Sequence, residues 1–310
     1  MTYRLMLVLL LMLMPPVMPS TLAQDDDALT DEDLELIAYV SDSFTNLLQM
    51  SSVTIEGSLN FLTEFQSDEQ SILQSVDSEL MYNLLLEDAR ILALQMTSVQ
   101  EAESRVEPGL DTTLNLSMEL RFVDGVSYLR IYDLPLLLAI FLSDDWINLN
   151  EDDGYPPELE VFSSEQLDFL ASIGGLGNYY TERTVTSIEE RPEETLEDGT
   201  TTRVFSVEVD PTQAFSGLEE TLRITLGLSE YSVGPVRFKY VILPTMTFNA
   251  VIWVDSATDL VAQVQVEWEI DSELESVDAP PADFHFVLSA ILAYTDFNEE
   301  VEIIAPDLGE

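Results

Sequence analysis

The sequence predicts an α+β fold that is built on a large curved antiparallel sheet with few helices. Apolar and polar residues alternate with a period of two in about eight segments, which is typical of half-buried strands. Most of these segments follow one another directly, and only two or three helical patterns interrupt them, which argues against a parallel sheet. So few helices leave part of the apolar face uncovered. The sheet therefore either closes into a lipocalin-like barrel or curls into an open half-barrel.

The composition indicates a folded chain and excludes several classes of site. The 310 residues carry 59 acidic against 11 basic groups, for a net charge of -48, yet 46% are apolar and the mean hydropathy is +0.11. Disordered chains combine high charge with low hydrophobicity, so this chain is expected to bury a core. Nucleic acid is excluded as a partner because its phosphates attract clustered lysine and arginine. Without cysteine, the chain forms no disulfide, zinc–thiolate site or acylated anchor.

The first residues have the pattern of a secretory signal peptide over residues 1–23. Arg4 precedes an apolar run from Leu5 to Leu13, and Thr21-Leu22-Ala23 resembles a cleavage site. The run is shorter than the roughly 20 residues that span a bilayer, and an uncleaved N-terminal anchor is the alternative. We therefore expect an extracytoplasmic protein, secreted or periplasmic, that is not lipidated and keeps no membrane span after cleavage.

A flexible acidic lead is expected over residues 24–30, and residues 31–310 are expected to form a single domain. Thr30 and Asp33 fit the capping pattern of a helix start. Apolar residues then recur at helical spacing, which predicts a helix over 31–50.

A hairpin is the most specific local prediction. Asp124-Gly125 stands between two alternating runs, 114–122 and 126–132, which is the strongest short-range hairpin signal. Segment 70–105, in contrast, satisfies neither the helical nor the strand template. Further strands are expected over 53–61, 146–149, 181–190, 201–209, 248–254, 262–270 and 284–294, and around 301–304. Further helices are expected over 163–173 and from Pro211 to about 226.

No catalytic group, cofactor or metal site is expected. His285, the only histidine, stands between Phe284 and Phe286 in a strand and is expected to point to the face opposite them. The segment Asn148–Asp153 resembles the start of an EF-hand loop but has aspartate where the sixth position requires glycine. A hydrolase that uses paired carboxylates is an alternative, although 59 acidic residues make such pairs uninformative. The apolar block 134–142 is too short to cross a bilayer and is either a buried helix or a lid.

Several motifs resemble LolA/LppX-type proteins, which are bacterial exported carriers of lipoproteins and lipids. Val251-Ile252-Trp253-Val254-Asp255, followed by Thr258-Asp259-Leu260-Val261, is similar to a strand, short turn and returning strand of that family. The stretch from Tyr294 to Pro306, the segments Gly125–Arg130 and Trp146-Ile147, and Gly57 match further family positions. The resemblance implies an unclosed antiparallel half-barrel with helices over its concave side and an apolar cavity between them. The acylated cysteine of the family's anchored members is absent here.

The strand pattern and the resemblance together predict a non-enzymatic carrier or binder of a lipid or another apolar ligand. An apolar cavity is enough for this, because burial of each methylene contributes about 0.8 kcal/mol. The candidates for the cavity face are Ile55, Leu59, Phe61, Leu116, Met118, Leu120, Phe286 and Leu288, with Leu137 and Phe141 near the mouth. Ordinary core packing is the alternative for each of them. The same fold with a closed core would instead be an envelope structural module that binds a protein partner.

Overall fold

The computed structural model describes most of the chain between residues 29 and 308. The described residues are 29–67, 71–87, 90–107, 110–132, 145–148, 180–216, 238–274 and 282–308. The predicted signal peptide, most of the acidic lead, the apolar block 134–142 and the predicted helix 163–173 lie outside them. The expectations for those segments therefore stay predictions.

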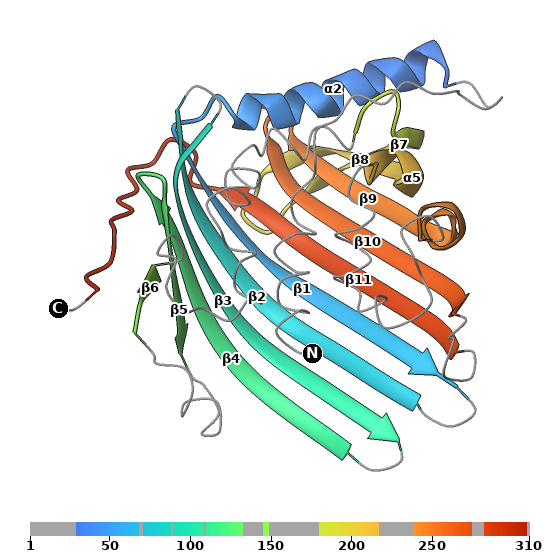
Figure 1. Ribbon diagram of the computed structural model, residues 1–310. Helices are drawn as coiled ribbons and strands as arrows, with labels where there is room; N and C mark the ends of the chain where they lie inside the picture. The colour runs from blue at the N-terminus through green and yellow to red at the C-terminus, as the bar shows by residue number, and fades with distance from the viewer. Residues whose placement is uncertain are drawn as a thin grey trace.

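One antiparallel sheet of eleven strands dominates the described structure (Figure 1). The strands of the first half are β1 (Ser52–Gln66), β2 (Ser71–Glu87), β3 (Arg90–Glu107), β4 (Leu110–Val123), β5 (Val126–Tyr132) and β6 (Ile147–Asn148). Those of the second half are β7 (Val185–Thr195), β8 (Thr201–Val209), β9 (Met246–Asp255), β10 (Val261–Leu274) and β11 (Ala282–Thr295). Their spatial order is β6-β5-β4-β3-β2-β1-β11-β10-β9-β8-β7, so β6 and β7 are the edges and the sheet is open. The prediction of a large, open, antiparallel sheet is confirmed.

The pairing of β1 with β11 joins the two halves of the sheet. Their ladder is regular from Thr54 opposite Thr295 to Gln66 opposite Asp283. Gly57 lies within this ladder, and a Cβ atom there would overlap the carbonyl oxygen of Ile291. Glycine at this position therefore permits the close approach of the two central strands.

The predicted hairpin and the predicted helix start are both present. Asp124 and Gly125 have φ angles of 54° and 78° and connect β4 to β5, as expected of an Asp-Gly hairpin turn. Helix α2 (Asp31–Leu47) begins after Thr30, whose Oγ1 accepts a hydrogen bond from the Asp33 backbone N–H at 3.2 Å. The Asp33 carboxylate accepts from the Thr30 backbone N–H at 2.8 Å, which completes the capping box.

The described helices do not form the predicted cover over the sheet. Figure 1 shows α2 lying across one end of the sheet, where it packs against β7, β9 and β10. Helix α5 (Pro211–Ala214) has four residues and begins after its Asp210 cap, and the predicted part from 217 to 226 lies outside the described residues. A π-helical turn (Phe238–Ile242) and a 3-10 turn (Leu243–Thr245) precede β9. The described fold is therefore mostly β, which corrects the α+β prediction.

The middle of α2 is held to β8 by an aromatic and ionic contact. The Tyr39 hydroxyl donates to Asp259 Oδ1 at 2.8 Å, and the Arg203 guanidinium lies 4.2 Å from the centre of the Tyr39 ring. Arg203 is held in turn by Glu190, with Nε–Oε1 and Nη2–Oε2 distances of 2.8 and 3.0 Å. The Arg203 hydrogen bonds hold the pKa of the Glu190 carboxyl below its usual range.

Among the described residues, no helix has the length and hydropathy of a transmembrane span.

The structure decides one segment that the sequence left ambiguous and corrects one predicted strand. The ambiguous segment 70–105 forms two of the longest strands, β2 and β3. The predicted strand around 301–304 is instead irregular. Before it, the Asn298 side chain accepts a hydrogen bond from the Ser51 backbone N–H at 2.8 Å, which ties this segment to the start of β1. Because β1 is already paired with β2 and β11, it offers no free edge to another strand.

Candidate functional site

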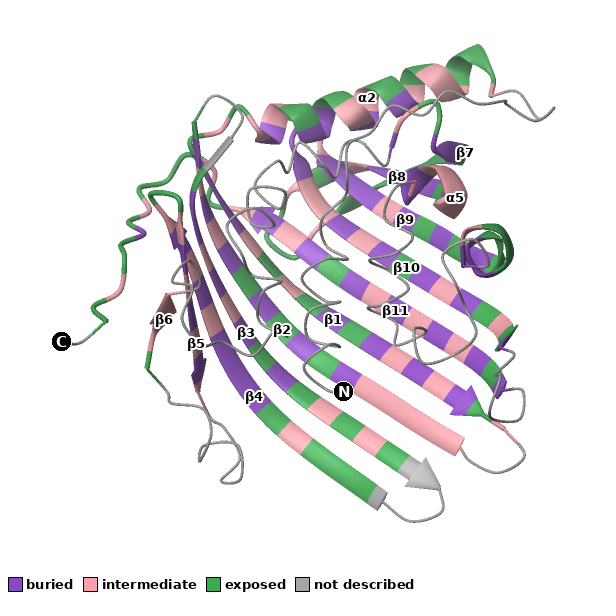
Figure 2. Cartoon of the chain, viewed as in Figure 1, coloured by how far each residue is buried: buried purple, intermediate pink, exposed green. Residues whose placement is uncertain are grey.

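The inner face of the sheet, which is its buried side, carries the predicted cavity residues. Figure 2 shows buried and exposed positions alternating along the strands, so that each strand turns one side chain inward and the next outward. One row of directly opposed inner-face residues crosses nine strands: Ile131, Met118, Ser98, Leu80, Gly57, Leu292, Val264, Ile252 and Phe205. This face is therefore one continuous and largely apolar surface that includes both halves of the chain.

Four of the predicted residues lie together at the junction of β1 and β11. Phe61 is directly opposite Leu288, and its ring makes an edge contact with Phe286 at a centroid distance of 5.2 Å. Leu59 belongs to the same surface, and both Leu59 and Phe286 have no exposed area.

The other predicted residues occupy three further places. Leu116, Met118 and Leu120 of β4 are buried on the same face, but β2 and β3 lie between β4 and β1. The distance between β4 and β1 is therefore about 14 Å at the usual strand spacing. Ile55 is half-buried and lies between Tyr82 of β2 and Tyr294 of β11. Leu137 and Phe141 lie outside the described residues.

An aromatic cluster on β9 and β10 belongs to this face and was not among the predicted site residues. Trp268 contacts Phe248 and Phe215, with ring-centroid distances of 5.2 and 5.0 Å. Trp268 is directly opposite Leu288, so the cluster continues the surface formed by Phe61 and Phe286. The alternating pattern of 262–270 already placed Trp268 on the buried side, so the signal for it was present in the sequence.

A small polar group interrupts the apolar surface on β2 and β3. The Ser78 and Ser98 hydroxyls lie 3.0 Å apart, and the Gln100 side-chain amide donates to Ser98 Oγ at 3.1 Å. All three residues are buried. These three side chains hydrogen-bond to one another and need no ligand as a partner, so the group is compatible with a closed core.

Four other buried polar atoms have no hydrogen-bond partner within the described part of the chain. They are the hydroxyls of Thr63, Tyr180 and Tyr294 and the indole Nε1 of Trp268. Thr63, Tyr294 and Trp268 lie on the inner face, since each alternates in register with its buried neighbours. Buried polar groups in folded proteins are nearly always paired, so these four atoms are candidate donors to a ligand or to water.

The tyrosines gather at the end of the inner face beneath α2. The Tyr180 ring stacks on Phe44 of α2 at a centroid distance of 5.3 Å, and Tyr82 and Tyr294 flank Ile55. Burial raises the pKa of Tyr82, Tyr180 and Tyr294 well above the ordinary value of a tyrosine, and the proximity of Tyr82 and Tyr180 raises that of Tyr294 further. These phenols therefore stay protonated and are available as hydrogen-bond donors.

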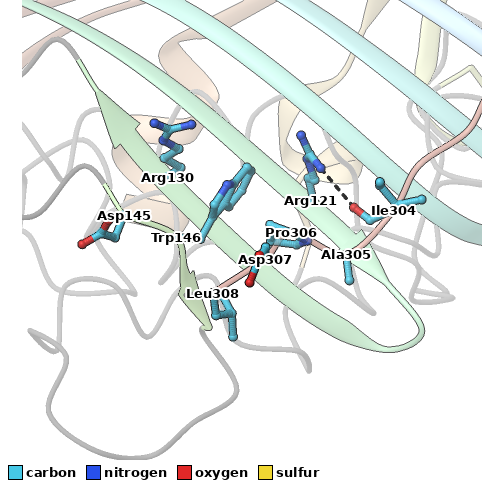
Figure 3. Close-up of a pocket in the computed structure, with 9 residues that line it drawn as sticks. All are labelled: Arg121, Arg130, Asp145, Trp146, Ile304, Ala305, Pro306, Asp307 and Leu308. Carbon is cyan, nitrogen blue, oxygen red and sulfur yellow. Dashed lines mark hydrogen bonds between the residues drawn. The ribbon is translucent and has the colours of Figure 1, made fainter. Parts of the chain in front are cut away.

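A separate cleft of about 430 Å³ lies on the outer face, between β4, β5, Trp146 and the C-terminal segment (Figure 3). The Arg121 guanidinium donates to the Ile304 carbonyl at 3.1 Å and to Glu119 Oε1 at 2.8 Å. The Cζ atom of Arg121 lies 4.8 Å from the centre of the Trp146 ring. Because Arg121 is already bound to a carboxylate, a carbonyl and a ring, this cleft is best described as a clamp that holds the C-terminal segment against β4. No pattern in the sequence predicted this contact.

Comparisons with known proteins give only faint matches. No protein-family model matches the chain, and no curated protein matches it significantly. A DUF1329 family protein from Desulfovibrio piger is 9% identical, with 88% of this chain and 95% of that chain covered and a TM-score of 0.25. A beta-barrel-like DUF1849 protein from Brucella abortus is 7% identical, with 78% and 98% covered and a TM-score of 0.16. The outer membrane protein OprG from Pseudomonas aeruginosa is 6% identical, with 79% and 96% covered and a TM-score of 0.17.

Similarities this faint carry no argument about function. The resemblance to LolA/LppX-type proteins therefore stays a prediction from the sequence motifs.

Proposed function

We propose that the protein is an exported, non-enzymatic binder or carrier of an amphiphile, a molecule with a long apolar chain and a group that accepts hydrogen bonds. The observation that carries the proposal is the set of buried donors without partners on an otherwise apolar face. The donors are Thr63, Tyr294 and Trp268 on the sheet and Tyr180 beneath α2. Export is inferred from the signal-peptide pattern of residues 1–23.

The energetics favour a ligand that is both apolar and polar. A buried polar group without a partner costs about 1–3 kcal/mol, so a purely apolar ligand would leave that cost in place. An amphiphile would remove it by accepting hydrogen bonds, and its chain would add about 0.8 kcal/mol for each buried methylene. The apolar surface between Phe61 and Phe248 would contact the chain. Trp268 within that surface and Thr63 beside Phe61 would contact polar groups of the ligand.

A second candidate function is a structural module that binds a protein partner and has a closed core. The hydrogen-bonded group of Ser78, Ser98 and Gln100 favours it, because that part of the inner face is satisfied without a ligand. In this case the unpaired donors elsewhere on the face would donate hydrogen bonds to buried water molecules.

Solvent extraction followed by mass spectrometry tests the proposal. The protein is purified without detergent from the extracytoplasmic fraction, and the extract is compared with one from the double variant Thr63→Val, Trp268→Phe. We expect about one amphiphile per chain in the unmodified protein and a several-fold lower occupancy in the variant. The matched control is Thr247→Val, because Thr247 is exposed on the outer face of β9 and its change should leave occupancy within twofold.

The proposal would be overturned by a folded protein whose extract holds no amphiphile and which binds no added fatty acid or phospholipid. Recovery of a stoichiometric protein partner from the same ligand-free preparation would support the structural module instead. Equal occupancy in the unmodified protein and the double variant would show that Thr63 and Trp268 do not donate hydrogen bonds to the ligand.

A further inference from the structure

We infer that the outer face of β10 and β11 carries a binding site for a divalent transition-metal ion of the zinc class, formed by Glu269, Asp271 and His285. One donor atom from each of the three side chains lies within 4.8 Å of the donor atoms of the other two. The inference is independent of the proposed function, because these side chains point to the face opposite the amphiphile-binding surface.

The strand register brings the three donors together. Asp271 and His285 are directly opposite one another, and Asp271 Oδ1 lies 2.7 Å from His285 Nδ1. Glu269 is two residues before Asp271 on the same strand and therefore projects from the same face. Both strands lie inside the sheet, where each is paired on both sides. The backbone positions of the three ligands are thus fixed before any ion binds.

The donor set selects the class of metal. Calcium and magnesium prefer oxygen ligands, whereas an imidazole nitrogen combined with carboxylates is typical of zinc and its transition-metal neighbours. In a tetrahedral zinc site with bonds of about 2.0–2.2 Å, neighbouring donor atoms lie about 3.4 Å apart. The donor atoms now lie within 4.8 Å of one another, so the widest pair would have to approach by about 1.4 Å on binding. Three protein ligands would leave a fourth position for water.

The electrostatic surroundings favour a cation at this position. Glu64 of β1 is directly opposite His285, so a further carboxylate lies on the other side of the imidazole. Within the described part of the chain, neither Glu269 nor Asp271 pairs with a lysine or arginine. The chain as a whole has a net charge of -48. Neighbouring carboxylates repel one another across a sheet, and a bound divalent ion would remove that repulsion.

The single histidine makes a direct test possible. Because His285 is the only imidazole, the chain prepared without a histidine tag gives one histidine Cε1–H signal in a proton–carbon NMR spectrum. We expect added ZnCl₂ to move or broaden this signal until one equivalent is bound, and added MgCl₂ at the same concentration to leave it in place. Isothermal titration should give one saturable zinc site per chain.

Substitutions separate a site from diffuse binding by carboxylates. We expect His285→Gln and Asp271→Asn each to weaken zinc binding at least tenfold. Glu267→Gln is the matched control, because Glu267 is an exposed carboxylate on the outer face of the same strand and its loss should change zinc affinity less than twofold. The inference is overturned if zinc leaves the histidine signal unchanged, or if all three variants bind zinc as the unmodified chain does.

Discussion

The two faces of β10 and β11 carry opposite chemistry on the same backbone. Ile270, Phe284 and Phe286 are almost fully buried on the inner face, whereas Glu269, Asp271 and His285 stand on the outer face one residue away. Among the described residues, no charged side chain is buried. A chain with a net charge of -48 can therefore hold a large apolar core, because the period of two in a strand separates charge from core at every step.

The largest expected effect separates the two faces within a single strand. Leu288→Ala on the inner face of β11 should lower the free energy of unfolding by about 2–5 kcal/mol, since it leaves a cavity. Ile291→Ala removes a similar number of carbons three residues away, where the side chain is 43% exposed, and should cost under about 1 kcal/mol. Urea unfolding measures both. Similar losses at the two positions would show that the faces are not distinct.

Alkaline pH should act on the inner face through its tyrosines. The pKa values of Tyr82, Tyr180 and Tyr294 are raised chiefly by burial, so the folded protein keeps three protons that the unfolded chain loses near pH 10. The stability from these groups is complete below pH 10 and is lost as the pH rises above it. Absorbance at 295 nm and circular dichroism, followed together, measure this.

We expect Tyr82, Tyr180 and Tyr294 to ionise only when the fold is lost, and Tyr294→Phe to make unfolding less steep in pH. Ionisation of these three tyrosines in a protein that keeps its native circular dichroism would contradict the burial of their rings.

Gly57 tests whether the inner face depends on the junction of β1 with β11. Gly57→Ala should cost about 1–3 kcal/mol, because the new methyl group would overlap the Ile291 carbonyl and backbone atoms must move. Ser58→Ala is the control at the neighbouring exposed position and should change stability by under about 0.5 kcal/mol. Urea unfolding of both variants measures the difference, and equal stability would mean that the two strands approach less closely.

The smallest expected effect has the opposite sign. Thr63→Val replaces an unpaired buried hydroxyl by a methyl group of similar size, so it should stabilise the ligand-free protein by about 1 kcal/mol. The same change at the exposed outer-face Thr247 should be neutral. Thermal unfolding of delipidated protein compares the two. A loss of stability in Thr63→Val would indicate that this hydroxyl has a partner in the ligand-free state.

Local sequence patterns predicted individual helices and hairpins, but they could not predict which strands pair across long stretches of the chain. Thr30 with Asp33 and Asp124 with Gly125 are local signals, and both the helix start and the hairpin are present. Segment 70–105 was ambiguous because inner-face positions of β2 and β3 hold polar Ser78, Ser98 and Gln100, while the outer face holds exposed Val99. Apolar residues on both faces and polar residues on the inner one obscure the period of two.

The candidate sites depended on information that a sequence pattern lacks. The predicted positions Leu59, Phe61, Phe286 and Leu288 came together only through the pairing of β1 with β11, which joins strands more than 200 residues apart. The prediction that His285 points away from Phe284 and Phe286 agrees with the structure, but its two carboxylate neighbours follow from the register of β10. The irregular end of the chain follows from the lack of a free edge on β1.

The indole signals in a proton–nitrogen NMR spectrum test the amphiphile proposal most directly. The chain has three tryptophans, and Trp253 Nε1 already donates to Glu194 Oε2 at 2.9 Å, whereas Trp268 Nε1 has no partner among the described residues. Addition of a long-chain fatty acid to delipidated protein should move the Trp268 signal downfield, saturate near one equivalent and leave the Trp253 signal in place. An unchanged Trp268 signal under saturating fatty acid and phospholipid would contradict the proposal.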